Sequence, residues 1–426
     1  MYKESYEIKS NYAKIANAAF LLTLFFAFFG TALPFRPEIE NVEDIGTSNI
    51  VNQISFSLIF ILSVISLTPN KEKLYSLILR EKFLTLFLLW CAISLIWSEF
   101  SFVAAKRLFQ IFSVVLAGYS FLLHDFSQSD LLKNIKIIMY PYLVFSLVSC
   151  LVIPGALDPN FHTWRGLATD KNNLGQIGLA CFVFSYMIYQ TEENFYSRMT
   201  AIIMSVISVL LLIGSMSSTS IIIFIVILSF AGIFFISKFF QEIGYAKIVA
   251  QLFILTIVLV AISVLTLAPE ILNLFPELFG KDSTFSGRTD LWTYIAFEIS
   301  KHPWLGTGYQ SFWLVENVNI ELLYKVFVWL PNQAHNGYLD IINEVGFIGF
   351  IFFLLFLVNY FFRISKISYD LGWKWFMIIA VISNLQESSF FRPGRLMNLL
   401  VILAYQVLIV LDANENSQVR TTPSRY

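Results

Sequence analysis

A polar segment, Asn332–Gly346 (NQAHNGYLDIINEVG), places a histidine, His335, just before an apolar run. Only 4 histidines occur among the 426 residues of the chain. Polar groups at the mouth of a membrane helix are costly to keep in apolar surroundings, so such a cluster is by default a candidate site. Histidine accepts a proton near neutral pH, which suits the activation of an attacking hydroxyl. The alternative is a structural histidine that hydrogen-bonds at a helix start.

Arginine and lysine residues near the ends of other apolar runs are suited to a phosphate-bearing ligand. Arginine offers a bidentate fork that fits phosphate oxygens. Arg288 begins a predicted helix, where free backbone N–H groups and the helix dipole favour an anion. Arg165 and Lys171 precede an apolar run at the depth of lipid headgroups. The alternatives are a snorkelling arginine on a capped helix and a lysine that only anchors to headgroups.

Six further residues are candidates for contact with a bound substrate. The two tyrosines could pack on a ring of the substrate or, alternatively, anchor the chain at the membrane interface. The glutamate and the arginine could complete the site or pair with each other. The six residues are Tyr309, Tyr338, Asn336, Glu387, Arg392 and His162. Lys106 and Arg107, one turn inside an apolar run, either snorkel outward or contact substrate.

The composition assigns the class of protein. Hydrophobic residues make up 57% and charged residues 13% of the chain, whereas a soluble domain averages about 45–50% and about 25%. The sequence therefore predicts a polytopic membrane protein. A formal net charge of −1 argues against a nucleic-acid partner, since no basic face is available to neutralise phosphates.

Metal and cofactor chemistry has no signature in the sequence. The 3 cysteines fall in apolar runs at unrelated spacings and are interpreted as buried thiols. No P-loop, no G-x-S-x-G elbow and no His/Cys/carboxylate spacing typical of zinc is present. We therefore expect no metal and no cofactor.

About twelve apolar runs could cross a membrane as helices, since a spanning helix needs about 17–25 residues. Backbone groups inside lipid must bond within their own segment, so the runs are predicted to be helical. The first run could instead be a cleaved signal peptide, but its length and the runs that follow favour a retained span. The runs are centred on Ile15–Leu33, Ile50–Leu67, Phe83–Trp97, Phe102–Leu123, Ile137–Ile153, Leu174–Tyr189, Ala201–Gly214, Ser220–Ile236, Val249–Leu267, Phe347–Phe362, Trp375–Asn384 and Leu396–Leu411.

The distribution of Lys and Arg predicts the orientation. With the N-terminus inside, the inner segments carry more Lys and Arg than the outer ones, which places both termini in the cytoplasm. Residues 1–426 are then predicted to form one integral membrane domain. The longer polar segments lie on its outer side, and they are Pro154–Asn173, Ala268–Gly346 and Glu387–Arg395. Within the large loop of residues 268–346, apolar residues recur at helical spacing over Arg288–Lys301, which predicts an amphipathic helix on the membrane surface.

Four separated stretches carry a family resemblance. They are Arg165-Gly166 followed by Lys171–Gly175, then Ser286–Trp292, His302–Tyr309 and Ala334–Gly346. Their order, with the apolar runs and one large late loop, resembles the O-antigen ligase and Wzy-type polysaccharide polymerase superfamily. The form RG…KNNLG resembles its exopolysaccharide-polymerase-like branch.

The resemblance implies an all-α glycosyltransferase of the GT-C type that is inverting and metal-independent. Its donor would be an oligosaccharide on undecaprenyl diphosphate, and its acceptor a sugar hydroxyl on the periplasmic side of the bacterial inner membrane. By motif match, the critical histidine is His335 and the critical arginines are Arg288 and Arg165. A chain-length regulator is a possible protein partner.

Three functions are compatible with these features. The first is a polymerase that joins lipid-linked repeat units of an O-antigen, exopolysaccharide or capsule. The second is an O-antigen ligase that transfers the glycan to lipid A-core or another acceptor. The third, from another class, is a flippase for the same lipid, which would be expected to show charged residues near the bilayer midplane and often an internal repeat.

Overall fold

The computed structural model describes residues 2–30, 35, 49–124, 127–158, 162–242, 288–314, 316–320, 323, 327, 331–365 and 372–421, with the backbone alone for 2–9, 230–231, 233–242 and 412–421. In these residues all regular elements are helices, apart from an isolated bridge between Leu157 and Trp164. The helices are α1 (Tyr2–Phe29), α2 (Ile50–Leu67), α3 (Lys71–Arg80), α4 (Phe83–Ile93), α5 (Ser101–Leu122), α6 (Gln128–Val152), α7 (Lys171–Thr191), α8 (Phe195–Gly214), α9 (Ser218–Glu242), α12 (Arg288–Lys301), α14 (Gly337–Ile364), α15 (Trp373–Ser383) and α16 (Leu396–Thr421), with short 3-10 turns at Thr68–Asn70, Ser94–Ile96 and Pro154–Ala156.

The predicted apolar runs coincide with these helices, except for Val249–Leu267, which lies outside the described residues. Six of the described helical segments are long and apolar enough to cross a membrane. Four shorter apolar helical segments are also present, and one of them, Trp373–Ser383, corresponds to the run predicted at Trp375–Asn384. The chain is therefore an all-α, multi-pass membrane protein, as its composition predicts. The six segments are Ser10–Phe29, Ile50–Arg80, Ser101–Leu122, Gln128–Val152, Phe195–Gly214 and Gly337–Ile364.

Several helices begin at side chains that satisfy their first backbone N–H groups. Ser127 and Asp130 form a reciprocal capping box at the start of α6. Asp170 caps α7 by accepting from the N–H of Asn173, and Asn194 caps α8. These polar caps mark where the chain enters its apolar segments.

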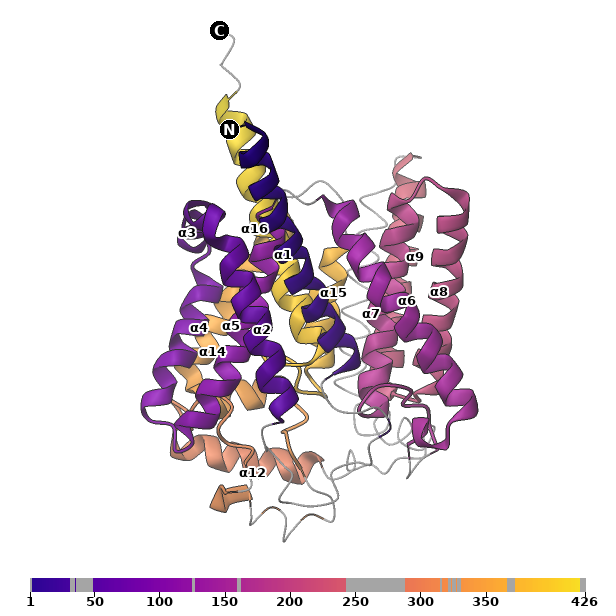
Figure 1. Cartoon of the computed structure of the whole chain (residues 1–426). Helices are drawn as coiled ribbons and strands as arrows, with labels where there is room; N and C mark the ends of the chain where they lie inside the picture. The colour runs from indigo at the N-terminus through magenta and orange to yellow at the C-terminus, as the bar shows by residue number, and fades with distance from the viewer. Residues whose placement is uncertain are drawn as a thin grey trace.

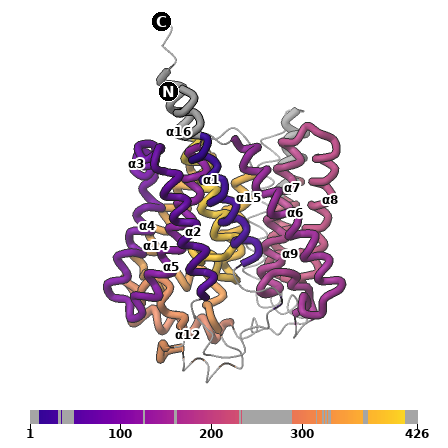
Figure 2. Tube along the Cα trace, in the orientation of Figure 1, coloured from indigo at the N-terminus to yellow at the C-terminus, as the bar shows by residue number. Residues whose placement is uncertain are grey.

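The first half of α16 forms the centre of the bundle. Residues 396–409 are buried on every face, which is expected of a helix that is apolar all round. It packs against α5, α14 and α15, and also touches α1 and α7. In Figures 1 and 2, α1 to α5 with α14 lie on one side of it, and α6 to α9 on the other. Two groups of helices are thus joined through α15 and α16.

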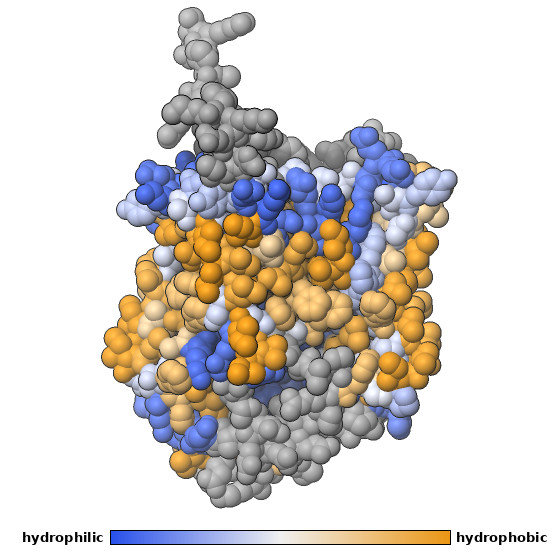
Figure 3. Space-filling view, in the orientation of Figure 1, coloured by the Kyte–Doolittle hydropathy of each residue, from blue (hydrophilic) through white to orange (hydrophobic). Residues whose placement is uncertain are grey.

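The two ends of the bundle differ. Helix α1 begins, and α16 ends, at the end opposite to α12, which lies across the other end (Figure 1). Figure 3 shows a hydrophobic belt around the middle and hydrophilic residues at the end where α1 begins. Exposed apolar side chains of α2, α6 and α8 belong to this belt. The described start of α1 and the described end of α16 therefore lie on the same side of the apolar belt.

Candidate active site at the converging ends of four helices

Helix α12 is bounded by Arg288 and Lys301, as predicted, but its apolar face meets protein as well as solvent. Leu291 and Ile295 are fully buried in a small core with Phe312 and other residues of the following loop. The apolar spacing predicts that this face lies in the membrane surface, and for Leu291 and Ile295 that prediction is wrong. Residues of the loop that follows α12 pack against these two side chains and cover them.

A sharp kink in α14 shapes the loop that follows α12. Gly346 has φ 67° and ψ −178°, a conformation that favours glycine. Two backbone hydrogen bonds join the loop to α14 at this kink. The N–H of Phe347 donates to Pro303 O at 2.8 Å, and the N–H of Gly308 donates to Glu344 O at 2.8 Å. A Cβ on Gly306 would lie 2.5 Å from the Glu344 carbonyl carbon. Glycine at both positions lets the two backbones touch.

The start of α14 meets the connection between α15 and α16. The N–H of Gly337 donates to Asn384 O at 2.8 Å and to Glu387 O at 3.1 Å. A Cβ at Gly337 would clash with the Asn384 side chain at 2.2 Å. Just before it, Asn336 caps α14 and His335 has φ 49°. For a non-glycine residue this backbone costs on the order of 1–3 kcal/mol, which the surroundings must offset.

Glu387 is the centre of the resulting cluster. His335 Nδ1 lies 3.4 Å from Glu387 Oε2, and Arg288 Nη2 lies 3.3 Å from Oε1. Asn172 Nδ2 donates to Oε1 at 2.8 Å, and Gln333 Nε2 donates to Oε2 at 3.4 Å. The carboxylate thus joins groups from α7, α12, the segment before α14 and the connection after α15.

The environment of Glu387 stabilises negative charge. Burial alone would raise the pKa of this carboxyl, but the hydrogen bond and charge of His335, together with Arg288 and Arg395, lower it below its ordinary value. A buried carboxyl group therefore stays ionised. The site is electropositive without Glu387, and the carboxylate is the anion that balances it.

Four helix N-termini converge on residues 386 and 387. Asn172 in the first turn of α7 bonds Glu387, and Thr219 Oγ1 in the first turn of α9 donates to Gln386 Oε1 at 2.6 Å. Arg288, the first residue of α12, donates through Nη1 to Gln386 O at 2.8 Å. Gly337, the first residue of α14, donates its N–H to Glu387 O. The dipoles of these helix N-termini favour negative charge near residues 386 and 387, while Asp170 already caps α7 and Asn336 caps α14.

A second ion cluster lies beside the first. Arg392 Nη2 is 2.6 Å from Glu344 Oε1 and 3.2 Å from Asp340 Oδ2. Burial would lower the pKa of Arg392, but Glu344 and Asp340 raise it above its ordinary value. Arg107 reaches the same region and donates to Gln310 O. Glu387 and Arg392 therefore do not pair with each other, because each already has partners of its own.

Arg165, Lys171 and His162 belong to the segment that leads into α7, where Asn172 contacts Glu387. Arg165 is 4% exposed and its Nε donates to Gly155 O at 3.0 Å. Lys171 is the first residue of α7, next to Asn172, and is half-buried. His162 is exposed and belongs to the loop before α7.

The predicted tyrosine contacts and Asn336 have local partners in this structure. Tyr309 is 3% exposed and its hydroxyl donates to Phe391 O at 2.6 Å. The Tyr338 hydroxyl donates to Val381 O at 2.7 Å. The Asn336 side chain accepts from the first N–H groups of α14. All three help to hold the framework of the site, and their contact with a sugar stays a prediction.

Sequence reasoning missed several polar residues of the cluster. Asn172 and Gln333 bond Glu387 directly, and Gln386 receives Arg288 and Thr219. The available signal was position, since Asn172 and Gln333 lie within the motifs that contain Lys171 and His335.

The fold and this cluster define a multi-pass helical membrane protein with a buried ionic site at one end of its bundle. Residues 203–354 match the family described as O-antigen ligase. The chain is also similar to the exopolysaccharide production protein ExoQ of Rhizobium meliloti (strain 1021), with 34% identity over 88 residues. That similarity covers 20% of this chain and 20% of the relative, so the chain is matched to about a fifth of the relative's length. These two matches confirm the resemblance to the O-antigen ligase and Wzy-type polymerase superfamily.

Proposed function

We propose that this protein is a metal-independent, inverting glycosyltransferase of the GT-C type that polymerises glycan repeat units carried on undecaprenyl diphosphate. In this proposal residues 1–426 form one integral domain of the bacterial inner membrane. Both termini face the cytoplasm, and the loop of residues 268–346 with the Glu387 cluster faces the periplasm.

The observation that carries the proposal is the meeting of Arg288 and His335 at Glu387. One residue suits a diphosphate and the other suits proton transfer, and both contact the same carboxylate at 3.3–3.4 Å. The His335 side chain is 18% exposed, so a substrate can reach it. A structural histidine alone would not require an arginine and four helix N-termini at the same point.

The reaction needs two kinds of stabilisation at once. The acceptor oxygen attacks the anomeric carbon while the bond between that carbon and the diphosphate oxygen breaks, and the leaving diphosphate takes the electron pair. Arg288 and the converging helix N-termini are in place to stabilise the growing negative charge without moving. In this proposal Lys171, the half-buried first residue of α7, extends the positive potential toward the lipid headgroup, and the buried Arg165 in the loop before α7 adds to it from within the protein.

His335 takes the acceptor proton in this mechanism, and Glu387 positions it. A carboxylate beside Nδ1 favours the tautomer with hydrogen on Nδ1, which makes Nε2 the basic nitrogen. Gln333 Nε2 holds the same carboxylate oxygen in place by donating to Glu387 Oε2 at 3.4 Å. The left-handed backbone at His335 turns this edge toward Glu387.

The second candidate is an O-antigen ligase, because the matched family carries that description. Both reactions share the donor and the proton transfer, and they differ in the acceptor. A flippase is less favoured, because the described ionic clusters lie at one end of the bundle, beside α12 and the start of α14, and not along a path through it.

Purified protein, incubated with an undecaprenyl-diphosphate-linked repeat unit alone, tests the proposal. A polymerase forms a ladder of longer lipid-linked glycans on a gel. A ligase leaves this substrate unchanged until lipid A-core or another acceptor is added, and then yields a single transfer product. Absence of any glycan transfer with either acceptor by folded protein would reject the glycosyltransferase proposal.

A further inference from the structure

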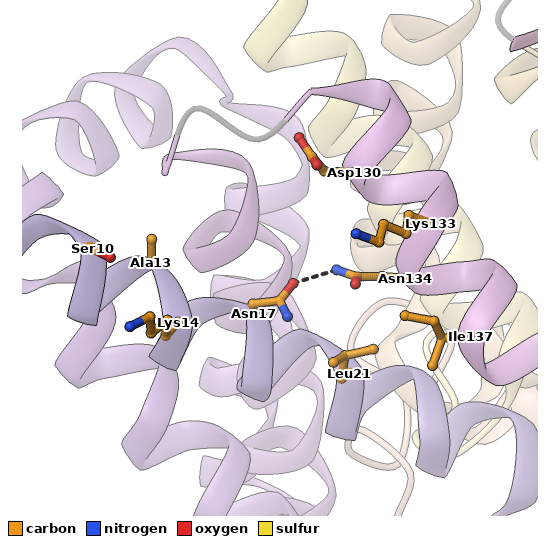
Figure 4. Close-up of a pocket in the computed structure, with 9 residues that line it drawn as sticks. All are labelled: Ser10, Ala13, Lys14, Asn17, Leu21, Asp130, Lys133, Asn134 and Ile137. Carbon is orange, nitrogen blue, oxygen red and sulfur yellow. Dashed lines mark hydrogen bonds between the residues drawn. The ribbon is translucent and has the colours of Figure 1, made fainter. Parts of the chain in front are cut away.

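Residues of α1 and α6 line a crevice (Figure 4) near the end of the bundle opposite to α12, where both helices begin (Figure 1). It has a volume of about 460 Å³. Each helix supplies one lysine, Lys14 from α1 and Lys133 from α6. Midway along it, Asn134 Nδ2 donates to Asn17 Oδ1 at 2.6 Å and ties the two helices together.

Polarity falls with depth along both walls of the crevice. On α1 the lining residues pass from Lys14 to Asn17 to Leu21, and on α6 from Lys133 through Asn134 to Ile137. Both helices contain a segment long enough to span a membrane, and in these segments, Ser10–Phe29 and Gln128–Val152, the named residues run from the second turn to the third or fourth. At about 1.5 Å of rise per residue, this polar-to-apolar change takes place over roughly 10 Å. The same gradient separates the headgroup of a lipid from the start of its acyl chains.

The charge of the crevice is positive at its mouth. Among the described residues, no carboxylate forms an ion pair with Lys14 or Lys133. The one acidic residue of the lining, Asp130, is occupied by the capping box, where it accepts from the N–H of Ser127 at 2.9 Å and from its hydroxyl at 2.7 Å. Asp130 also attracts Lys133 through its charge, so the lining carries one net positive charge, and neither ammonium group is held in an ion pair with a described carboxylate.

We propose that this crevice binds the phosphate headgroup of an anionic glycerophospholipid. Lys14 and Lys133 contact the phosphate from opposite walls, and the acyl chains continue along Leu21 and Ile137. Basic pockets between membrane helices are suited to such headgroups. A free phosphate would satisfy the lysines but would leave the apolar lower wall unused, which favours the lipid.

Native mass spectrometry of the full-length protein in detergent tests the site, with phosphatidylglycerol as the probe and phosphatidylcholine as the zwitterionic comparison. We expect one phosphatidylglycerol to be retained at least fivefold more than phosphatidylcholine. Lys14→Gln with Lys133→Gln should remove this preference. Lys14→Arg with Lys133→Arg should keep it, which controls for damage to the fold.

A matched control uses two lysines at the same end of the bundle but outside the crevice. Lys71→Gln with Lys82→Gln makes the same change in charge and should leave the preference intact. Loss of the preference in this control, or its persistence in the crevice variant, would overturn the proposal. Inorganic phosphate at millimolar concentration should not displace the lipid. If it binds with the same lysine dependence and displaces the lipid, the site is one for a free anion.

Discussion

His335 and Glu387 face each other across two connections of the chain, with Nδ1 of the histidine 3.4 Å from Oε2 of the glutamate. The other carboxylate oxygen, Oε1, is shared by Arg288 and Asn172. One carboxylate therefore links the group proposed to take a proton with the group proposed to bind a diphosphate. A shift of Arg288 or of His335 would therefore change the position of Glu387, and through it the position of the other residue.

Glu387→Gln should lower the rate of glycan transfer more than it weakens substrate binding. The variant keeps the size of the side chain but loses the charge that orients His335 and holds Arg288. We expect kcat to fall about tenfold to a hundredfold, which corresponds to about 1.4–2.7 kcal/mol of transition-state stabilisation, with a smaller change in KM. Initial rates of chain growth against substrate concentration measure both.

Two further variants decide whether Glu387 acts by position. Glu387→Asp keeps the charge and should recover part of kcat. Glu192→Gln removes a carboxylate paired with Lys136 elsewhere in the protein and should be neutral. Equal loss of activity in Glu387→Gln and Glu387→Asp would speak for a role in packing alone.

The lowered pKa of Glu387 makes a prediction about acid stability. A carboxyl group with a folded-state pKa below its unfolded value stabilises the fold fully above that unfolded value, which is about 4.3 for glutamate. The contribution is lost as the pH falls through the folded-state pKa. The melting temperature of wild type minus that of Glu387→Gln should therefore be constant above about pH 5.5 and shrink below about pH 4.3.

Thermal unfolding of both proteins in detergent, from pH 3 to pH 7, measures this difference. A difference that instead grows with falling pH would mean that the carboxyl group is protonated in the folded protein at neutral pH.

Arg288→Lys should weaken donor binding while keeping the charge. Lysine cannot present two parallel N–H groups, and it cannot reach Gln386 O and Glu387 Oε1 together as Arg288 does. We expect kcat/KM to fall about tenfold or more, a loss of at least about 1.4 kcal/mol. Arg198→Lys, at the opposite end of the bundle on α8, is the matched control. Unchanged kcat/KM in Arg288→Lys would refute a forked contact with the diphosphate.

Arg392→Gln should destabilise the protein. It leaves Asp340 and Glu344, which are 2% and 4% exposed, without their shared cation. Removing one partner of a buried ion pair costs about 3–5 kcal/mol. Adding Glu344→Gln to Arg392→Gln removes part of the uncompensated charge and should raise the melting temperature again. If the double variant is less stable than Arg392→Gln, then charge balance is not what stabilises the cluster of Arg392, Asp340 and Glu344.

The sequence was sufficient to predict most of the helices, because long apolar runs have few alternatives in a membrane. Ile50–Leu67 and Arg288–Lys301 were predicted with the bounds that the structure has. The charges in the loops predict that both termini lie on one side of the membrane. In the structure the start of α1 and the end of α16 lie at the same end of the bundle. The ninth run, Val249–Leu267, lies outside the described residues and stays a prediction.

The arrangement of the site was harder to predict, because it depends on contacts between distant segments. Nothing in the local sequence indicates that Glu387 faces His335 and not Arg392, or that Asn172 reaches the same carboxylate. The membrane-surface interpretation of α12 missed the burial of Leu291 and Ile295, since an apolar stripe does not reveal whether protein or lipid covers it. The motifs identified the candidate residues, and the packing of the helix ends shows which of these residues lie together.

The most direct test of the account is the effect of His335→Ala on glycan transfer. His302→Ala serves as the control, because His302 is exposed and follows α12 away from the cluster. Both variants are purified, checked for folding by size-exclusion chromatography and thermal unfolding, and given the lipid-linked repeat unit. The account predicts that His335→Ala still binds the donor but forms no detectable longer glycan, whereas His302→Ala forms the wild-type ladder. A folded His335→Ala variant that makes wild-type amounts of longer glycan would contradict it.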